Sequence, residues 1–257
     1  MRRVSGKVAL VTGAGSGQGA VGARLLAQEG AKVIATDIDY GSVRKVVGEI
    51  NMQNPGAGLA LKHDVSMRDD WFNTIRTGVE AFGPITVLIN NTDIPTPTFR
   101  YQAPEENSIR TRNIDAWSHF VGMETVVPVM KWAGVGSIVD VAPLEVLVAC
   151  VHFDTYATRR RTADAFLRTV AAELAPFNIR VNAIAQGLIE KPAKNDVLSL
   201  IRSAESISGD RYFCSSGLAD DVGQLVLYLA SDESSSMTGT LHIIDPVGFN
   251  VSERGVG

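Results

Sequence analysis

Cysteine is scarce in this 257-residue sequence, which has two, and histidine is nearly as rare, with four. The two cysteines, Cys150 and Cys214, cannot build a disulfide framework and are typical of a protein that stays in the reducing cytoplasm. The four histidines lack the spacing of metal ligands along the chain. We therefore expect a cytoplasmic protein without disulfides and without a metal site.

Long hydrophobic runs and an excess of one charge are also missing. Arg2 and Arg3 precede an apolar run of only four residues, so the sequence predicts neither a secretory signal nor a membrane span. The net charge is −4, and Arg159–Arg161 is the only dense basic cluster. We therefore expect neither nucleic acid nor an anionic membrane as a partner.

The sequence does contain a regular alternation of short apolar runs and longer amphipathic segments. Strands are predicted at 7–12, 32–37, 58–65, 85–91, 135–142, 178–185 and 240–245. Helices are predicted at 18–29, 41–51, 67–82, 107–132, 153–175 and 218–231. Apolar strands separated by helices indicate a parallel sheet with helices on both faces, because each connection must cross back over the sheet. The predicted fold is α/β, a single-domain, Rossmann-like doubly wound sheet of about seven strands.

One domain over residues 1–257 agrees with the length and with a hydrophobic content of 45%. Ligands of such folds bind beyond the carboxyl ends of the strands. Residues 187–217 have the least regular pattern, and we interpret them as a substrate loop or lid over that site. A plain surface excursion is the alternative interpretation.

A glycine-rich turn lies between the first predicted strand and the first predicted helix, from Thr12 to Gly19. Glycines let the backbone approach a pyrophosphate closely, and the helix that follows presents its free amides and the positive end of its dipole. The position of the turn makes this motif informative, because a glycine-rich string alone occurs in many contexts. The residues expected to hold a dinucleotide are Gly13, Ser16, Gly17, Gln18 and Gly19.

Asp37 stands at the end of the second predicted strand, 18 residues after Gly19. A carboxylate there can accept hydrogen bonds from both ribose hydroxyls and would repel a 2′-phosphate, which favours NAD over NADP. The alternative is that Asp37 caps the next helix, a task that Asp39 could perform equally well.

These features resemble the classical short-chain dehydrogenase/reductase family, and the resemblance runs from about Gly6 to Gly248. The matching positions are the glycine motif of Thr12, Gly13, Gly17 and Gly19, the adenine-contacting pair Asp64-Val65, Asn90-Asn91 of the Asn-Asn-Ala-Gly element, the helix asparagine Asn113, the catalytic tyrosine Tyr156, and Thr238-Gly239. The resemblance implies an oxidoreductase that binds NAD partly through Asp64, Val65 and Asn90. It also implies dimers or tetramers, formed with itself or with a homologue through the helices at 107–132 and 153–175.

Several positions at the chemical end depart from the family pattern. The family's serine, 13 positions before the tyrosine, is Pro143, which offers neither a hydroxyl nor an amide hydrogen. The family's lysine is Arg160, which keeps the positive charge but is larger and planar. Thr92-Asp93 replaces Ala-Gly beside the path of the cofactor, so whether NAD binds stays open. Two further replacements are Gln186 for a proline and Lys191 for a threonine.

The candidate catalytic residues are therefore Tyr156, Arg160 and Asn113, without a serine. Our first hypothesis is a non-catalytic subunit, or pseudoenzyme, that supports an active dehydrogenase homologue, for example in a β-oxidation-like hydroxyacyl-CoA pathway. The second is an NAD(H)-dependent alcohol or carbonyl oxidoreductase that acts on a small-molecule substrate through Tyr156 and Arg160. The third is a dinucleotide sensor whose partner binding responds to NAD.

Overall fold

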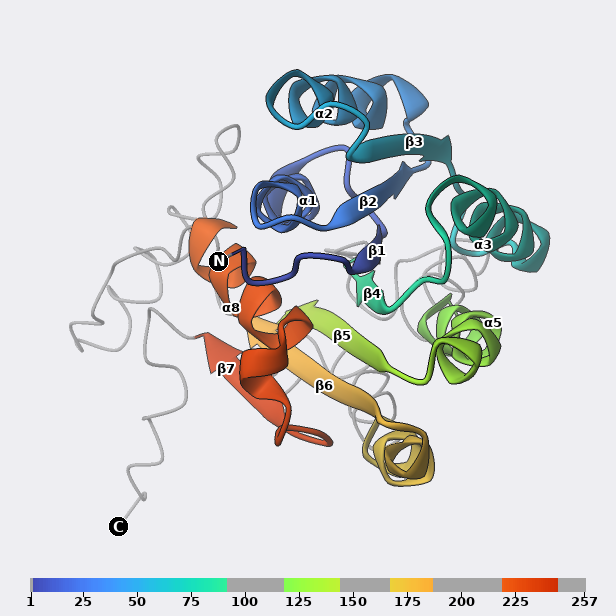
Figure 1. The fold of residues 1–257 in the computed structure, drawn as a ribbon, viewed down its shortest axis with the longest axis vertical. Coiled ribbons are helices and arrows are strands. Elements are labelled where there is room, and N and C mark those ends of the chain that lie inside the picture. The colour runs from blue at the N-terminus through green and yellow to red at the C-terminus, as the bar shows by residue number, and fades with distance from the viewer. Residues whose placement is uncertain (1, 92–117, 144–166, 187–218, 245–257) are drawn as a thin grey trace, which may run out of the picture.

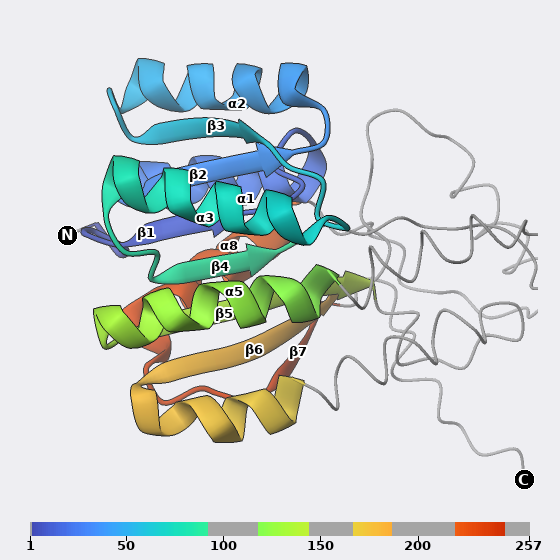
Figure 2. The same cartoon turned by 90° about the vertical axis from the view of Figure 1, so that its right-hand side faces the viewer.

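The computed structural model of the protein describes residues 2–91, 118–143, 167–186 and 219–244. The strands in these ranges form one seven-stranded sheet in the order β3-β2-β1-β4-β5-β6-β7, and all neighbouring pairs are parallel. All strands therefore end at one edge of the sheet, to which the arrows in Figure 2 point. The strands are β1 (Val8–Val11), β2 (Lys32–Asp37), β3 (Gly58–Lys62), β4 (Val87–Asn90), β5 (Gly136–Pro143), β6 (Ile179–Gln186) and β7 (Leu241–Ile244).

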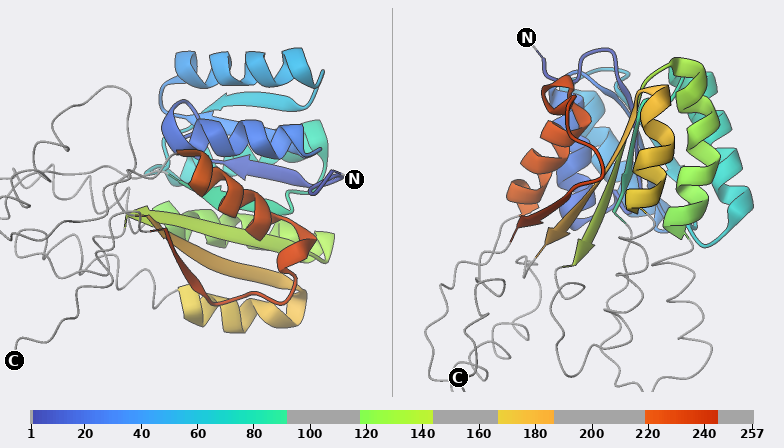
Figure 3. Two further views of the ribbon diagram at one scale, coloured as in Figure 1. Left: turned by 90° about the vertical axis from the view of Figure 1, so that its left-hand side faces the viewer. Right: turned by 90° about the horizontal axis from the view of Figure 1, so that it is seen from below.

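Helices cover both faces of the sheet (Figures 1 and 3). One layer consists of α1 (Gly17–Gln28), α2 (Tyr40–Gln53) and α8 (Ala219–Ala230). The other consists of α3 (Arg68–Phe82), α5 (Ser118–Ala133) and the helical residues 167–174. Two short 3-10 helices, η3 (Ala175–Phe177) and η4 (Asp232–Ser234), follow the helical residues 167–174 and α8. The predicted doubly wound α/β fold is confirmed.

Side chains of each central strand alternate between the two layers, because successive residues of a strand point to opposite faces. In β1, Ala9 and Val11 belong to the core cluster under α1, α2 and α8, whereas Val8 and Leu10 belong to the cluster under α3 and α5. All four residues are buried. Burial on both faces explains why the sequence of β1 is continuously apolar.

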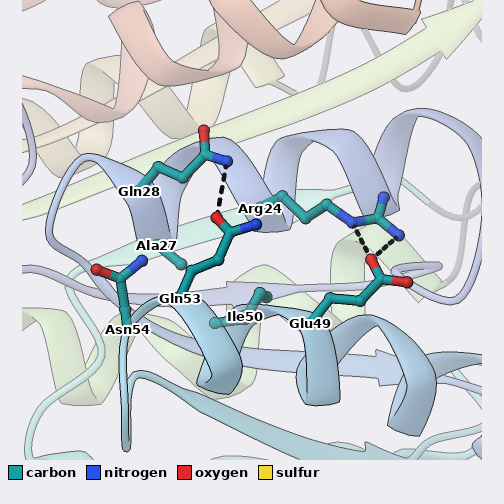
Figure 4. A pocket seen from close by; sticks show the side chains of 7 residues that line it. All are labelled: Arg24, Ala27, Gln28, Glu49, Ile50, Gln53 and Asn54. Carbon is teal, nitrogen blue, oxygen red and sulfur yellow. Dashed lines mark hydrogen bonds and ion pairs between the residues drawn. The ribbon is translucent and has the colours of Figure 1, made fainter.

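The helices α1 and α2 also contact each other at the surface (Figure 4). Arg24 forms an ion pair with Glu49 at 2.7 Å, and the Gln28 side-chain amide donates to the Gln53 oxygen at 3.3 Å. These side chains line a small surface hollow between the two helices. The hollow lies away from the strand ends at which doubly wound folds bind ligands.

The predicted element boundaries agree with the structure to within a few residues. The clearest difference is β3, which ends at Lys62 rather than at residue 65, because the carboxylate of Asp64 accepts hydrogen bonds from Ser66 and begins a turn. The predicted helices at 107–132 and 153–175 are described only from residues 118 and 167 onward, and the predicted lid at 187–217 lies outside the described residues. Among the residues that the structure describes, no helix has the length and apolar character needed to cross a membrane.

Candidate functional site

The glycine-rich turn follows β1 at the carboxyl edge of the sheet and is tied to the end of β4. Thr12 is buried, and its hydroxyl accepts a hydrogen bond from the backbone amide of Asn91 at 3.0 Å. The side-chain amide of Asn91 lies 3.4 Å from the carbonyl oxygen of Thr12 and 3.5 Å from that of Gly13. Because β1 and β4 are neighbours in the sheet, these contacts hold the turn at the point where the strand order reverses.

The turn also has the backbone geometry that a pyrophosphate requires. Gly13 and Gly17 have φ values of +61° and +54°, in the left-handed region that favours glycine. A Cβ atom on Gly19 would lie 2.2 Å from the carbonyl oxygen of Gly13, so no larger residue fits there. A Cβ atom on Gly17 would meet nothing within 4 Å, which leaves this position open to a ligand.

The amino terminus of α1 is free of side-chain capping. Ser16 is the N-cap residue, yet its side chain makes no capping hydrogen bond. The first amides of a helix have no partner within it, and they carry the positive end of the dipole. Ser16 and Gly17 are exposed, and Gln18 is partly exposed. The described residues of this turn therefore fit the pyrophosphate of a dinucleotide.

Asp37, the last residue of β2, holds its carboxylate against the turn. One carboxylate oxygen accepts from the Gly15 amide at 3.0 Å and the other from the Asp39 amide at 2.9 Å. Asp39 performs the capping task instead, since its side chain accepts from the amides of Gly41 and Ser42 at the start of α2. Hydrogen bonds from Ser42 keep the pKa of Asp39 below its usual value. The capping role is therefore filled without Asp37.

Asp64 and Val65 lie in the turn between β3 and α3. The Asp64 carboxylate accepts from the amide and hydroxyl of Ser66, at 3.0 Å and 2.6 Å. The Val65 carbonyl oxygen accepts from the indole nitrogen of the buried Trp71 at 2.9 Å. These bonds give the turn a defined shape at the carboxyl edge, two strands away from the glycine-rich turn.

Asn90 is the last residue of β4 and is only 1% exposed. Neither its side-chain oxygen nor its side-chain nitrogen has a hydrogen-bond partner. Buried amides usually form hydrogen bonds with protein or with an ordered water. The side chain of Asn90 is therefore an unsatisfied polar group within the core of the sheet. Its register neighbour on β5 is Asp140.

The expected chemical end is only partly described. Pro143 is the last residue of β5 and lies in register with Gln186 at the end of β6. Tyr156, Arg160 and Asn113 lie outside the described residues. So do Thr92-Asp93 and Lys191.

Three polar contacts near this edge were not anticipated from the sequence. Asn91 holds the glycine-rich turn through its contacts with Thr12 and Gly13. His63 is 1% exposed, lies 3.1 Å from the Thr36 hydroxyl and packs edge-on against Trp71. His119 of α5 pairs with Asp140 of β5, and both are buried. Only the repeated Asn90-Asn91 carried a signal in the sequence, because strand register and helix position create the other two pairs.

The comparisons with known proteins agree with this geometry. A family model described as Enoyl-(Acyl carrier protein) reductase matches residues 13–250. The trans-4-hydroxycyclohexanecarboxylate dehydrogenase of Sinomonas cyclohexanicum is 35% identical over 95% of this chain and 93% of its own length. A cyclopentanol dehydrogenase from a Comamonas species is 32% identical over 95% of this chain and 98% of its own. The 3-alpha-(or 20-beta)-hydroxysteroid dehydrogenase of Mycobacterium tuberculosis is 34% identical over 95% of this chain and 89% of its own.

Proposed function

The chain belongs to the short-chain dehydrogenase/reductase family of oxidoreductases, and we propose that it binds NAD(H) as a non-catalytic subunit beside an active homologue. The observation that carries the cofactor half of this proposal is the contact between Asp37 and the amide of Gly15. The observation that carries the other half is the proline at position 143.

The cofactor preference follows from charge. The carboxylates of Asp37 and Asp39 stand within two residues of each other at the end of β2, and Asp37 is bonded to the glycine-rich turn. A ribose with two free hydroxyls can donate to Asp37, whereas a 2′-phosphate would bring like charges together. Gly13, Gly17 and Gly19 would hold the pyrophosphate with the first amides of α1. When bound, the nicotinamide ring would supply hydride chemistry.

The proposed lack of catalytic activity follows from the hydroxyl that Pro143 does not have. A serine hydroxyl at the end of β5 would donate a hydrogen bond to the reacting oxygen, and Pro143 cannot. Losing one such donor typically reduces the rate by roughly 10² to 10³. Arg160 keeps a positive charge near Tyr156 in the sequence, but a guanidinium does not reproduce the compact ammonium of lysine. The fold and the glycine-rich turn thus follow the family pattern, whereas the residues of the chemical end depart from it.

The proposal is tested by titrating the purified chain with NADH and NADPH in a calorimeter, and by assaying it with NAD and cyclic secondary alcohols. We expect binding of NADH in preference to NADPH and no turnover. A native purification should also retain a homologous dehydrogenase. Absence of NADH binding would refute the cofactor half, and turnover that disappears in Tyr156→Phe would refute the non-catalytic half.

A second function, NAD-dependent oxidation of a cyclic secondary alcohol, is favoured by the relatives. Two of them are named for cyclohexane and cyclopentane alcohols. In this case Tyr156 would take the hydroxyl proton of the alcohol, and Arg160 would lower the pKa of that tyrosine. It predicts a rate that Tyr156→Phe abolishes and Arg160→Lys preserves or raises. An inert wild-type protein would exclude it.

A further inference from the structure

The contact between the side chains of His119 and Asp140 lies inside the apolar core under α3 and α5. The side chains of His119 and Asp140 are 4% and 3% exposed. The strand residue two positions before Asp140 is Ile138, which belongs to this cluster, and Val126 and Met130 of α5 also contribute to it. Polar groups taken out of water lose hydration that their mutual contact often fails to restore, so stability alone is a poor explanation for such a buried pair.

The pair joins two elements whose covalent connection lies at the opposite edge of the sheet. The helix α5 ends at Ala133, and β5 begins at Gly136, so the covalent connection is short and lies at the amino edge. His119 is near the described start of α5, and Asp140 is in the carboxyl half of β5. The pair therefore fixes the far ends of both elements, at the edge where the ligand site lies.

The helix α5 is weakened in its middle and packs closely against α3 near its start. Pro128 removes one backbone hydrogen bond inside the helix. The hydroxyl of Thr125 donates to the carbonyl of Val121 at 2.7 Å, a bond that often bends helices. At Gly122, a Cβ atom would lie 2.6 Å from the ring of Trp71, so glycine permits a close approach to α3.

Two of the expected chemical residues precede α5 or follow β5 in the sequence. Asn113 lies five positions before Ser118, the first described residue of α5, and Tyr156 lies in the segment that follows β5. The other side of Asp140 in the sheet is the unsatisfied Asn90, which ends β4. The pair therefore lies near the carboxyl ends of β4 and β5, next to the point between β1 and β4 where the strand order reverses.

We propose that His119 and Asp140 are a positioning pair, which holds the start of α5 against β5 and so supports the nicotinamide half of the NAD(H) site. This inference rests on the proposed cofactor binding for its ligand. The pair touches neither the glycine-rich turn nor Asp37, so the adenosine half of the site does not depend on it.

The test compares NADH with ADP-ribose, which lacks the nicotinamide ring, in binding titrations of the full-length Asp140→Asn variant. We expect affinity for NADH to fall roughly tenfold, as when a supporting group behind a ligand is removed, and affinity for ADP-ribose to stay within twofold or so. Ser137→Ala is the matched control, because this buried hydroxyl of β5 bonds to Leu229 on the other side of the molecule. Equal losses for both ligands would overturn the proposal.

A double variant, His119→Leu with Asp140→Val, keeps the test informative where the single variant folds poorly. Replacing both members of a buried pair with apolar residues is often neutral or stabilising, so this protein should be stable and still bind NADH weakly. Recovery of NADH affinity would show that the pair only fills space. Amide hydrogen exchange of the ligand-free Asp140→Asn variant, compared with wild type, tests the proposal without any ligand. Exchange should be faster in the variant in peptides from the start of α5 and the end of β5, and unchanged exchange there would also overturn the proposal.

Discussion

Asp37 and Asp39 have different tasks although they are two residues apart, and we propose that Asp37 sets the preference for NAD(H) over NADP(H). Asp39 caps α2, whereas Asp37 faces the glycine-rich turn. In Asp37→Asn, the repulsion of a 2′-phosphate disappears, so the ratio of NADPH to NADH affinity should rise by about tenfold or more. Fluorescence titration with both cofactors measures the ratio. Asp39→Asn is the control and should change the ratio much less. An unchanged ratio in Asp37→Asn would exclude the assigned role.

His63 makes the stability of the fold depend on pH. Burial lowers the pKa of His63 to about 4, against the opposing effect of Asp70 and Asp64. The unfolded chain takes up a proton near pH 6.5, while the folded chain resists protonation down to about pH 4. The free energy of unfolding should therefore fall by about 3 kcal/mol as the pH decreases across this window, and should not change through His63 above it.

Urea denaturation of wild type and His63→Leu at several pH values measures this dependence. The variant should lose less stability between pH 6.5 and pH 4. Its free energy of unfolding, plotted against pH, should have a slope that is smaller by the equivalent of about one bound proton. Parallel curves for the two proteins would show that His63 does not titrate in this way.

At the scale of elements, the start of α1 depends on one glycine and tolerates change at another. In Gly19→Ala, the new Cβ would lie 2.2 Å from a backbone oxygen of Gly13, so the turn must move and NADH binding should fall at least about tenfold. In Gly22→Ala, the nearest atom would be a Val226 methyl at 3.8 Å, an ordinary contact. This control should bind NADH normally and gain about 0.5–1 kcal/mol of stability. Equal NADH binding by both variants would contradict the proposed role of the glycine-rich turn in holding the pyrophosphate.

The end of α8 is held to β6 by Arg180. Its guanidinium donates to the carbonyl oxygens of Leu229 and Ser231 at 2.8 Å and 3.1 Å, and to the Ser234 hydroxyl at 2.9 Å. Burial lowers the pKa of Arg180, a cost that these bonds offset. Arg180→Met removes these three hydrogen bonds and should lower the free energy of unfolding by about 3 kcal/mol, because each bond contributes about 1 kcal/mol.

Chemical denaturation of Arg180→Met measures this loss, with Arg24→Ala as the control. Arg24 forms an exposed ion pair with Glu49 on the surface between α1 and α2, and such pairs contribute about 0–1 kcal/mol. Similar losses in the two variants would contradict the role of Arg180 as the connection between β6 and α8.

At the scale of the whole molecule, the fold could be predicted because its signals are local. The apolar run of β1 and the glycines after it report burial and backbone conformation directly. The separate tasks of Asp37 and Asp39 could not be assigned, because both carboxylates suit either position. The pair of His119 and Asp140 could not be found either, because strand register and the packing of α5 on β5 bring these distant residues together. The roles of Tyr156, Arg160 and Asn113 stay predictions from the resemblance.

The central claim is that the molecule holds NAD(H) without using it. A single-turnover experiment tests both parts at once: NADH is mixed with an excess of the full-length protein, a cyclic ketone is added, and nicotinamide fluorescence is followed. We expect the fluorescence to change on binding and then to stay constant after the ketone is added. Absence of the first change, or a decay of bound NADH that Tyr156→Phe abolishes, would contradict the account.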